Sequence, residues 1–205
     1  MAKADNPGGI PSGADDFDSV AWCYDRVPVP THPKHLAPRM KQVQGPIVDL
    51  GGGTGKYTMR ILSEGHKPTI VVDPARKMLA KGRRKGRDIG FIQAMGESLP
   101  IPDSSVAGVV ITEAFHHFGR SQPQVVKEIA RILRSDGLLL IEEPDPGRFF
   151  GRLMAWGERL QGMSSVFHRP AGLVAMLEPC FGSVTVHRTG WFTYAVECRN
   201  PNPAG

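Results

Sequence analysis

The chain has 205 residues, which is the size of one folded domain. Its 40% hydrophobic and 22% charged residues are typical of a globular protein and exclude a fibrous or disordered one. No apolar run approaches the roughly 20 residues needed to span a bilayer, and the first residues lack the apolar core of a secretory signal. Three widely spaced cysteines argue against a disulfide scaffold or a zinc ribbon, and we expect a cytoplasmic protein without a metal site.

The formal net charge of +5 comes almost entirely from one segment. Residues 76–88 contain seven basic side chains and one acid, so the rest of the chain is nearly neutral. Such a run can bind phosphate or an anionic membrane, but it is more often the solvated face of a helix. We expect a solvated face, with Arg83, Arg84, Lys85 and Arg87 too far along the helix to influence a ligand at its start.

The beginning of the chain predicts a leader followed by short helices. Residues 1–14 are rich in Gly, Pro and small polar types and indicate a flexible leader. Apolar residues spaced three to four apart predict a helix over 15–27, and a second short helix is expected over 34–44. We expect residues 15–205 to form a single domain.

Buried strands then alternate with helices. We expect strands at 47–50, 69–73, 89–93, 106–112 and 138–142, with helices at 56–64, 74–85 and 122–133. In the tail we expect helices at 149–160 and 170–177, followed by strands at 183–187 and 192–198. The pattern predicts an α/β fold with a mostly parallel seven-stranded sheet, helices on both faces and an antiparallel C-terminal hairpin.

A glycine loop follows the first expected strand, in the motif Asp49-Leu-Gly-Gly-Gly-Thr-Gly55. Glycines at alternate positions (Gly51, Gly53 and Gly55) let a ligand approach the backbone closely. The spacing fits neither a phosphate-binding Walker loop nor the dinucleotide pattern. Asp73 ends the second expected strand, where a carboxylate can accept both hydroxyls of a ribose, although it can also cap the helix that follows.

Four ordered blocks now resemble one family. They are Val48-Asp-Leu-Gly-Gly-Gly-Thr-Gly55, Val72-Asp-Pro-Ala-Arg-Lys-Met-Leu79, the pair Gly96-Glu-Ser-Leu-Pro-Ile-Pro-Asp-Ser-Ser105 and Glu113-Ala-Phe-His-His117, and Lys127-Glu-Ile-Ala-Arg-Ile-Leu-Arg-Ser-Asp-Gly137. The chain resembles the class I S-adenosylmethionine (SAM) methyltransferases of the methyltransferase-11 type. The resemblance implies a Rossmann-like fold, SAM as cofactor and S-adenosylhomocysteine as product.

The resemblance also implies roles for individual residues. Cofactor contacts would come from Tyr24, Asp49, Gly51, Gly53, Gly55, Asp73, Met78, Met95, Gly96, Glu97 and Thr112. Among them, Asp49 would position the ammonium group, Asp73 the ribose, and Tyr24 would cover the cofactor. Met95 stands where the family usually has an acid that accepts from the adenine amino group, so one hydrogen bond of about 0.5–1.5 kcal/mol is expected to be absent.

The family places a histidine pair beside the sulfonium, so the resemblance makes His117 the candidate catalytic base, with a packing role as the alternative. His168 in the tail is a second candidate, and of Glu142 and Glu143 we expect one to face the substrate and the other to point outward. Residues 145–181 are a candidate substrate lid, because Met and aromatic residues recur there at helical spacing.

The favoured function is methyl transfer from SAM to a small apolar or aromatic acceptor. One alternative is an RNA methyltransferase using the basic segment 76–87, which is less favoured because no RNA-binding module or motif for base amines accompanies it. The other is a SAM-binding protein without turnover. The acceptor and the oligomeric state stay open.

Overall fold

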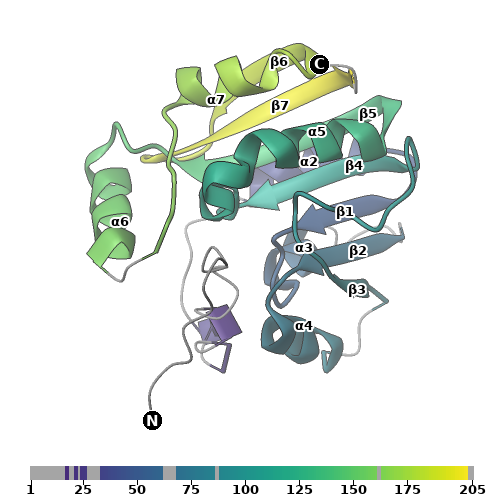
Figure 1. Ribbon diagram of the computed structural model, residues 1–205, viewed down its shortest axis with the longest axis horizontal. Helices are drawn as coiled ribbons and strands as arrows, with labels where there is room; N and C mark the ends of the chain where they lie inside the picture. Colours follow the sequence, from purple (N-terminus) through teal and green to yellow (C-terminus); the bar gives the residue numbers. More distant parts are fainter. Residues whose placement is uncertain are drawn as a thin grey trace, which may run out of the picture.

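Figure 1 shows the computed structural model, which describes residues 17–18, 21–22, 24–26, 33–61, 68–85, 88–160 and 163–202. The expected leader at 1–14 and parts of the expected helix at 15–27 lie outside these residues. Within the described residues, no helix is both long and apolar enough to cross a membrane. The grouping of residues 15–205 into one domain stays a prediction.

A single seven-stranded sheet forms the centre of the fold, in the order β3-β2-β1-β4-β5-β7-β6 (Figure 1). Its strands are β1 Ile47–Leu50, β2 Thr69–Asp73, β3 Gly90–Gln93, β4 Val106–Thr112, β5 Leu133–Pro144, β6 Phe181–Arg188 and β7 Thr193–Pro201. The first five pair in parallel, whereas β7 is antiparallel to both β5 and β6. The predicted parallel sheet and antiparallel C-terminal hairpin are therefore confirmed.

Helices cover both faces of the sheet, as predicted. They are η1 Tyr24–Arg26, α2 Pro33–Gln42, α3 Lys56–Ile61, α4 Arg76–Arg83, η2 Phe115–Ser121, α5 Gln122–Ile132, α6 Phe149–Leu160 and α7 Pro170–Leu177. The side chains of β5 alternate between two cores, because successive residues of a strand point to opposite faces. Leu139 packs in the core that holds α5 and α7, and Leu140 packs with Leu36 and Met40 of α2.

The expected and observed boundaries differ mainly around β5 and η2. Strand β5 begins at Leu133, five residues before the expected strand, because the backbone of Leu133 already pairs with Val106. The 3₁₀ helix η2 was not expected, since a short turn of this kind has no apolar periodicity. It bends at Gly119, whose φ of 53° lies in the left-handed region.

Candidate active site

The glycine loop connects β1 to α3 at the carboxyl edge of the sheet. Strand β1 pairs with β2 on one side and β4 on the other, so the loop lies between the ends of both neighbours. Gly51, Gly53 and Gly55 have φ values of 75°, 54° and 68°, which side chains rarely adopt. A Cβ on Gly51 would also lie 2.7 Å from the Cβ of Ala114 after β4. The loop therefore needs these glycines to form, and Gly51 and Gly52 at its start stay partly exposed at this edge of the sheet.

Asp49 is buried directly beneath this loop. Its Oδ2 accepts a hydrogen bond from the Thr58 hydroxyl, while its Oδ1 is buried and has no partner among the described residues. Burial, reinforced by the negative charge of Asp73, raises the pKa of the Asp49 carboxyl to about 7. A Cβ on Gly52 would lie 2.5 Å from the Asp49 carboxylate, so this glycine, which the sequence analysis did not single out, makes room for it.

Asp73 links the end of β2 to the loop and to the start of α4. Its Oδ2 accepts from the Gly53 backbone N–H at 2.9 Å, and its Oδ1 accepts from that of Ala75 at 2.7 Å. Burial raises the pKa of Asp73 to about 6. The contact with Ala75 fits the alternative that Asp73 caps the start of α4. Each carboxylate oxygen also keeps a lone pair for a ligand hydroxyl. Its role toward ribose stays a prediction.

The N-terminal segment packs over this part of the loop. Phe17 and Tyr24 lie against a small core of Ala21, Ala75 and Met78. Burial raises the pKa of the Tyr24 hydroxyl, and the charges of Tyr57, Glu113, Asp73 and Asp49 raise it further. Tyr24 therefore lies close to the acids of the candidate site, a position compatible with its expected covering role.

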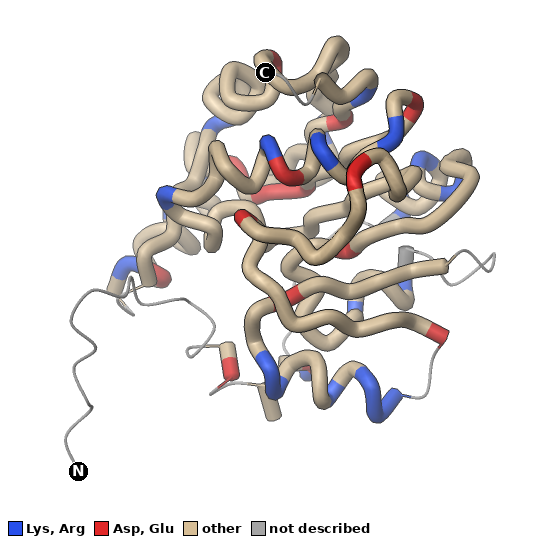
Figure 2. Tube along the Cα trace, turned by 45° about the vertical axis from the view of Figure 1, so that its right-hand side comes forward, with Lys and Arg blue, Asp and Glu red and all other residues tan. Residues whose placement is uncertain are grey.

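The basic segment is less solvated than expected. Asp25 forms ion pairs with Lys81 at 3.3 Å and Lys85 at 3.1 Å, which join the N-terminal segment to α4 and the turn after it. Figure 2 shows the Lys and Arg residues of α4 in blue. The Lys85 Nζ also lies 3.0 Å from both the carbonyl oxygen and the hydroxyl of Thr54 in the glycine loop. The expectation that Lys85 lies too far away to influence the ligand site is wrong; Arg87 lies outside the described residues.

The residues expected around adenine are only partly brought together. Met78 is buried, and its methyl group lies 3.3 Å from where a Cβ on Gly53 would be. Gly96 packs against the Phe118 ring, and Glu97 accepts a 3.4 Å hydrogen bond from Ser121. Met95 is 41% exposed, and Thr112 is buried at the end of β4. The contacts of these residues with a cofactor stay predictions.

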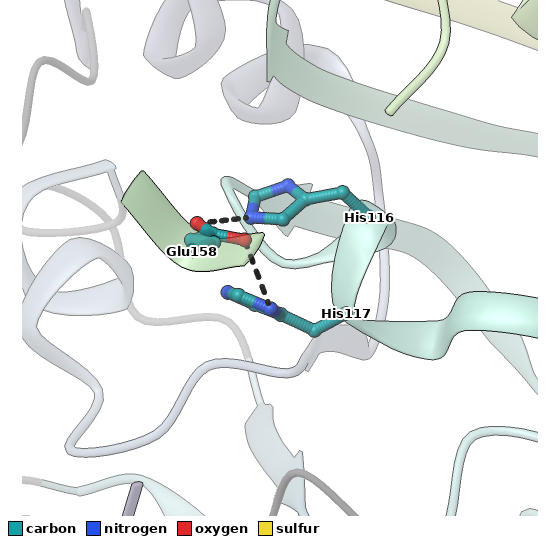
Figure 3. Close-up of side chains that lie close together, drawn as sticks. All are labelled: His116, His117 and Glu158. Carbon is teal, nitrogen blue, oxygen red and sulfur yellow. Dashed lines mark ion pairs between the residues drawn. The ribbon is translucent and has the colours of Figure 1, made fainter. Parts of the chain in front are cut away.

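A second group of polar residues follows β4, centred on two histidines (Figure 3). His116 Nδ1 lies 2.5 Å from Glu143 Oε2, and His116 Nε2 lies 3.4 Å from Glu158 Oε1 on α6. His117 Nδ1 lies 3.1 Å from the Ser165 hydroxyl and 3.9 Å from Glu158 Oε2. Although burial opposes it, the Glu143 and Glu158 carboxylates raise the pKa of His116 to about 10. Burial and the positive charge of His116 lower the pKa of His117 to about 3.

Glu113 completes this group, and the sequence analysis gave it no role. It has a left-handed φ of 49°, and its Oε1 is buried without a hydrogen-bond partner in the described part of the chain. Burial and the charges of Glu143 and Glu142 raise the pKa of Glu113 to about 8. Glu142 and Glu143 are both buried, so the expectation that one of them points outward is wrong.

The segment after β5 covers the histidines. Glu158 of α6 approaches both rings, as Figure 3 shows. The Val166 N–H donates to the His116 carbonyl at 2.9 Å, and the Phe167 ring stacks on the His116 ring at 4.2 Å. His168 lies elsewhere, with its Nε2 2.8 Å from Gln122 Oε1 on α5.

Comparison with known proteins finds similar sequences for the segment that contains the glycine loop. Residues 48–141 match the profile of the Methyltransferase domain family. A methyltransferase-like protein of Schizosaccharomyces pombe is 36% identical over 93 residues, which are 45% of this chain and 36% of that protein. The ubiquinone/menaquinone biosynthesis C-methyltransferase UbiE of Vibrio cholerae is 36% identical over 107 residues, 47% of this chain and 40% of its own. The chain thus matches less than half the length of these relatives.

Solved structures show the same fold. A Haloferax volcanii protein in complex with the Trm112 methyltransferase activator superposes with a TM-score of 0.74 at 20% identity, over 93% of this chain and 98% of its own. Human N-acetylserotonin methyltransferase, solved with SAM, gives a TM-score of 0.75 at 15% identity, over 92% of this chain and 57% of its own. Residues 48–141 are thus similar to the Methyltransferase domain family, and the seven-stranded sheet has the fold of the class I SAM-dependent methyltransferases.

Proposed function

We propose that the protein binds SAM at the glycine loop and transfers its methyl group to a small apolar or aromatic acceptor. The observation that carries the proposal is Asp49, a fully buried carboxylate whose Oδ1 has no partner in the described structure. A buried charge without a partner is costly, so such a group is retained where a ligand completes it. The ammonium group of the methionine moiety has the charge and the donors that Asp49 lacks.

The remaining contacts with SAM would come from residues at the carboxyl edge of the sheet. Asp73 keeps one lone pair on each oxygen for the two ribose hydroxyls while its backbone contacts hold the loop. Met78 and Tyr24 would supply the apolar walls beside the adenosine. When bound, SAM supplies a methyl group already activated by positive sulfur.

The residues after β4 would then align the acceptor and exclude water. Alignment alone can supply much of the rate of a displacement of this kind. An acceptor with a hydroxyl or acidic C–H group also needs a base, for which His117 is the residue that the resemblance implies. His117 is neutral at pH 7, since its pKa is about 3, and is therefore a weak base. Glu113 is a further candidate that the structure adds, because its carboxyl has a pKa of about 8.

An apolar acceptor is favoured by the segment proposed as a lid, 145–181. Phe167 stacks on His116, and Phe17 meets the His117 ring edge-on at 4.8 Å, so aromatic groups already line this side of the histidines. The lid proposal rests on these contacts together with those of Glu158 and Ser165.

The RNA alternative has less support. Lys81 and Lys85 already pair with Asp25, and the Arg83 guanidinium donates to the Phe91 carbonyl at 2.8 Å. Fewer cations of the segment 76–87 are thereby left for phosphates, which dominate nucleic-acid affinity. A methyl-transfer assay over a panel of small acceptors distinguishes the proposed enzyme from the alternative of a protein that binds SAM without turnover.

Thermal unfolding with added ligands tests the proposal. SAM and S-adenosylhomocysteine should each raise the melting temperature in proportion to the logarithm of their concentration above Kd, while NADH and ATP should leave it unchanged. Equal stabilisation by ATP or NADH, with none by SAM, would contradict the proposed function.

A further inference from the structure

The histidine cluster contains the parts of a metal site. His116, His117 and Glu158 each offer one ligand atom, and these atoms lie within 4.8 Å of one another. They come from two separate elements, the η2 turn and α6, so the cluster is built by the fold and not by one local sequence (Figure 3). Two imidazoles and one carboxylate form a ligand set that zinc uses in sites with an open fourth position.

The distances already approach those of a bound ion. Zinc lies about 2.0–2.2 Å from nitrogen and carboxylate ligands, so its tetrahedral ligand atoms lie roughly 3.3 Å apart. His116 Nε2 and Glu158 Oε1 are 3.4 Å apart, which fits directly. His117 Nδ1 and Glu158 Oε2 are 3.9 Å apart, so a small rotation of the His117 ring would close the set.

Two further observations point to a missing cation. Glu158 Oε2 is buried and has no hydrogen-bond partner in the described structure. Further carboxylates lie beside the ligands: Glu143 is buried against His116, and Glu113, whose Oε1 is buried without a partner in the described structure, is within electrostatic reach of His116. A divalent ion would supply two positive charges to this group.

Glu143 has the position of an outer partner of such a site. It holds His116 Nδ1 at 2.5 Å and also accepts from the Phe115 N–H at 2.9 Å, which fixes the ring and points Nε2 at Glu158. Ligating histidines almost always give their other ring nitrogen to a carboxylate, a carbonyl or water. The arrangement therefore includes the orienting contact as well as the ligands.

We propose that His116 Nε2, His117 Nδ1 and the Glu158 carboxylate bind one divalent transition-metal ion, with Zn²⁺ as the fitting species. The fourth position is left to water or, if the proposed methyl transfer is correct, to a hydroxyl, thiol or nitrogen of the acceptor. In that arrangement His117 acts as a ligand and not as the base.

Metal titration of the full chain tests this site. After treatment with a chelator, the protein is titrated with Zn²⁺ by calorimetry and with Co²⁺ by visible absorption, which reports a tetrahedral nitrogen and oxygen environment. We expect one ion per chain, and a loss of affinity of at least about tenfold in H117Q and E158Q and of about 10- to 100-fold in the outer-partner variant E143Q. Melting curves of the metal-free variants show whether each one folds.

A matched control uses a histidine–glutamate pair that lies elsewhere in the described structure. His187 Nε2 lies 3.2 Å from Glu197 Oε2 between β6 and β7, so H187Q removes a comparable pair without touching the proposed site. H187Q should bind metal like the wild type. Equal Zn²⁺ affinity in wild type, H117Q and E158Q, or a Co²⁺ spectrum with thiolate bands, would overturn the site. SAM binding by the chelator-treated protein is measured in parallel and tests the proposed function separately.

Discussion

Replacing Asp49 by Asn should separate ligand binding from stability, because the two respond in opposite directions. The carboxylate is fully buried, and its pKa of about 7 lies roughly three pH units above the ordinary 3.8. At about 1.4 kcal/mol per unit, holding the ionised form in the fold costs roughly 4 kcal/mol above pH 7. Asn keeps the shape and the Thr58 contact but leaves its buried NH2 group unpaired, at a cost of about 1–3 kcal/mol, so a net gain of about 1–3 kcal/mol is expected at pH 8.

The pH dependence of this gain has a definite sign. The folded-state pKa of Asp49 is raised above the unfolded value, so its contribution to stability is complete below pH 4 and is lost as the pH rises through about 7. The Asn variant removes that loss. The difference in the free energy of unfolding between D49N and wild type should therefore grow between pH 5 and pH 8.

Ligand affinity should fall in the same variant. The charge-assisted contact with the SAM ammonium group is worth about 1.5–3 kcal/mol, so D49N should bind SAM roughly 10- to 150-fold more weakly. Calorimetric SAM titration and urea unfolding, both at pH 8, measure the two effects. The exposed Asp136 provides the control, because D136N should change neither. A D49N variant that binds SAM as the wild type does, or that is less stable at pH 8, would refute the reasoning.

The remaining predictions concern the loop contacts and pH. Asp73→Ala loses the bond from the Gly53 N–H, and calorimetry should show SAM affinity reduced by about 1–3 kcal/mol in a protein that still folds; an unchanged affinity would leave Asp73 only a helix-start role. Lys85→Gln loses the contacts with Thr54, and SAM affinity should drop about three- to tenfold, whereas the exposed Arg84→Gln should have no effect. In the wild type, SAM affinity should rise between pH 5.5 and 7.5, because the ammonium group favours the ionised form of Asp49; a flat profile would contradict that partnership.

The fold was predictable because its signals are local. Short apolar runs predict β2 and β4 with the boundaries that the structure shows, and the expected limits of α6 and α7 also match. Strand β5 was predicted too short, since Ser135 and Gly137 are poor strand formers but lie in a segment that pairs from Leu133 onward. Here the pairing overrides the local preference.

The site was predictable only where it follows the chain. Asp73 ends one apolar strand and Asp49 is the second-last residue of another, so their positions near the sheet edge could be inferred. Glu158 could not be inferred, because a glutamate on an amphipathic helix normally faces solvent, and only the placement of α6 brings it to the histidines. Lys85 was misjudged for a similar reason, since its partner Asp25 is 60 residues away.

A crystal structure with S-adenosylhomocysteine tests the central claim most directly. The account predicts the ligand across the carboxyl ends of β1 and β2, with its ammonium group at Asp49 Oδ1 and its ribose hydroxyls on Asp73. A ligand bound at another edge of the sheet, or one that leaves Asp49 Oδ1 without a partner, would contradict it.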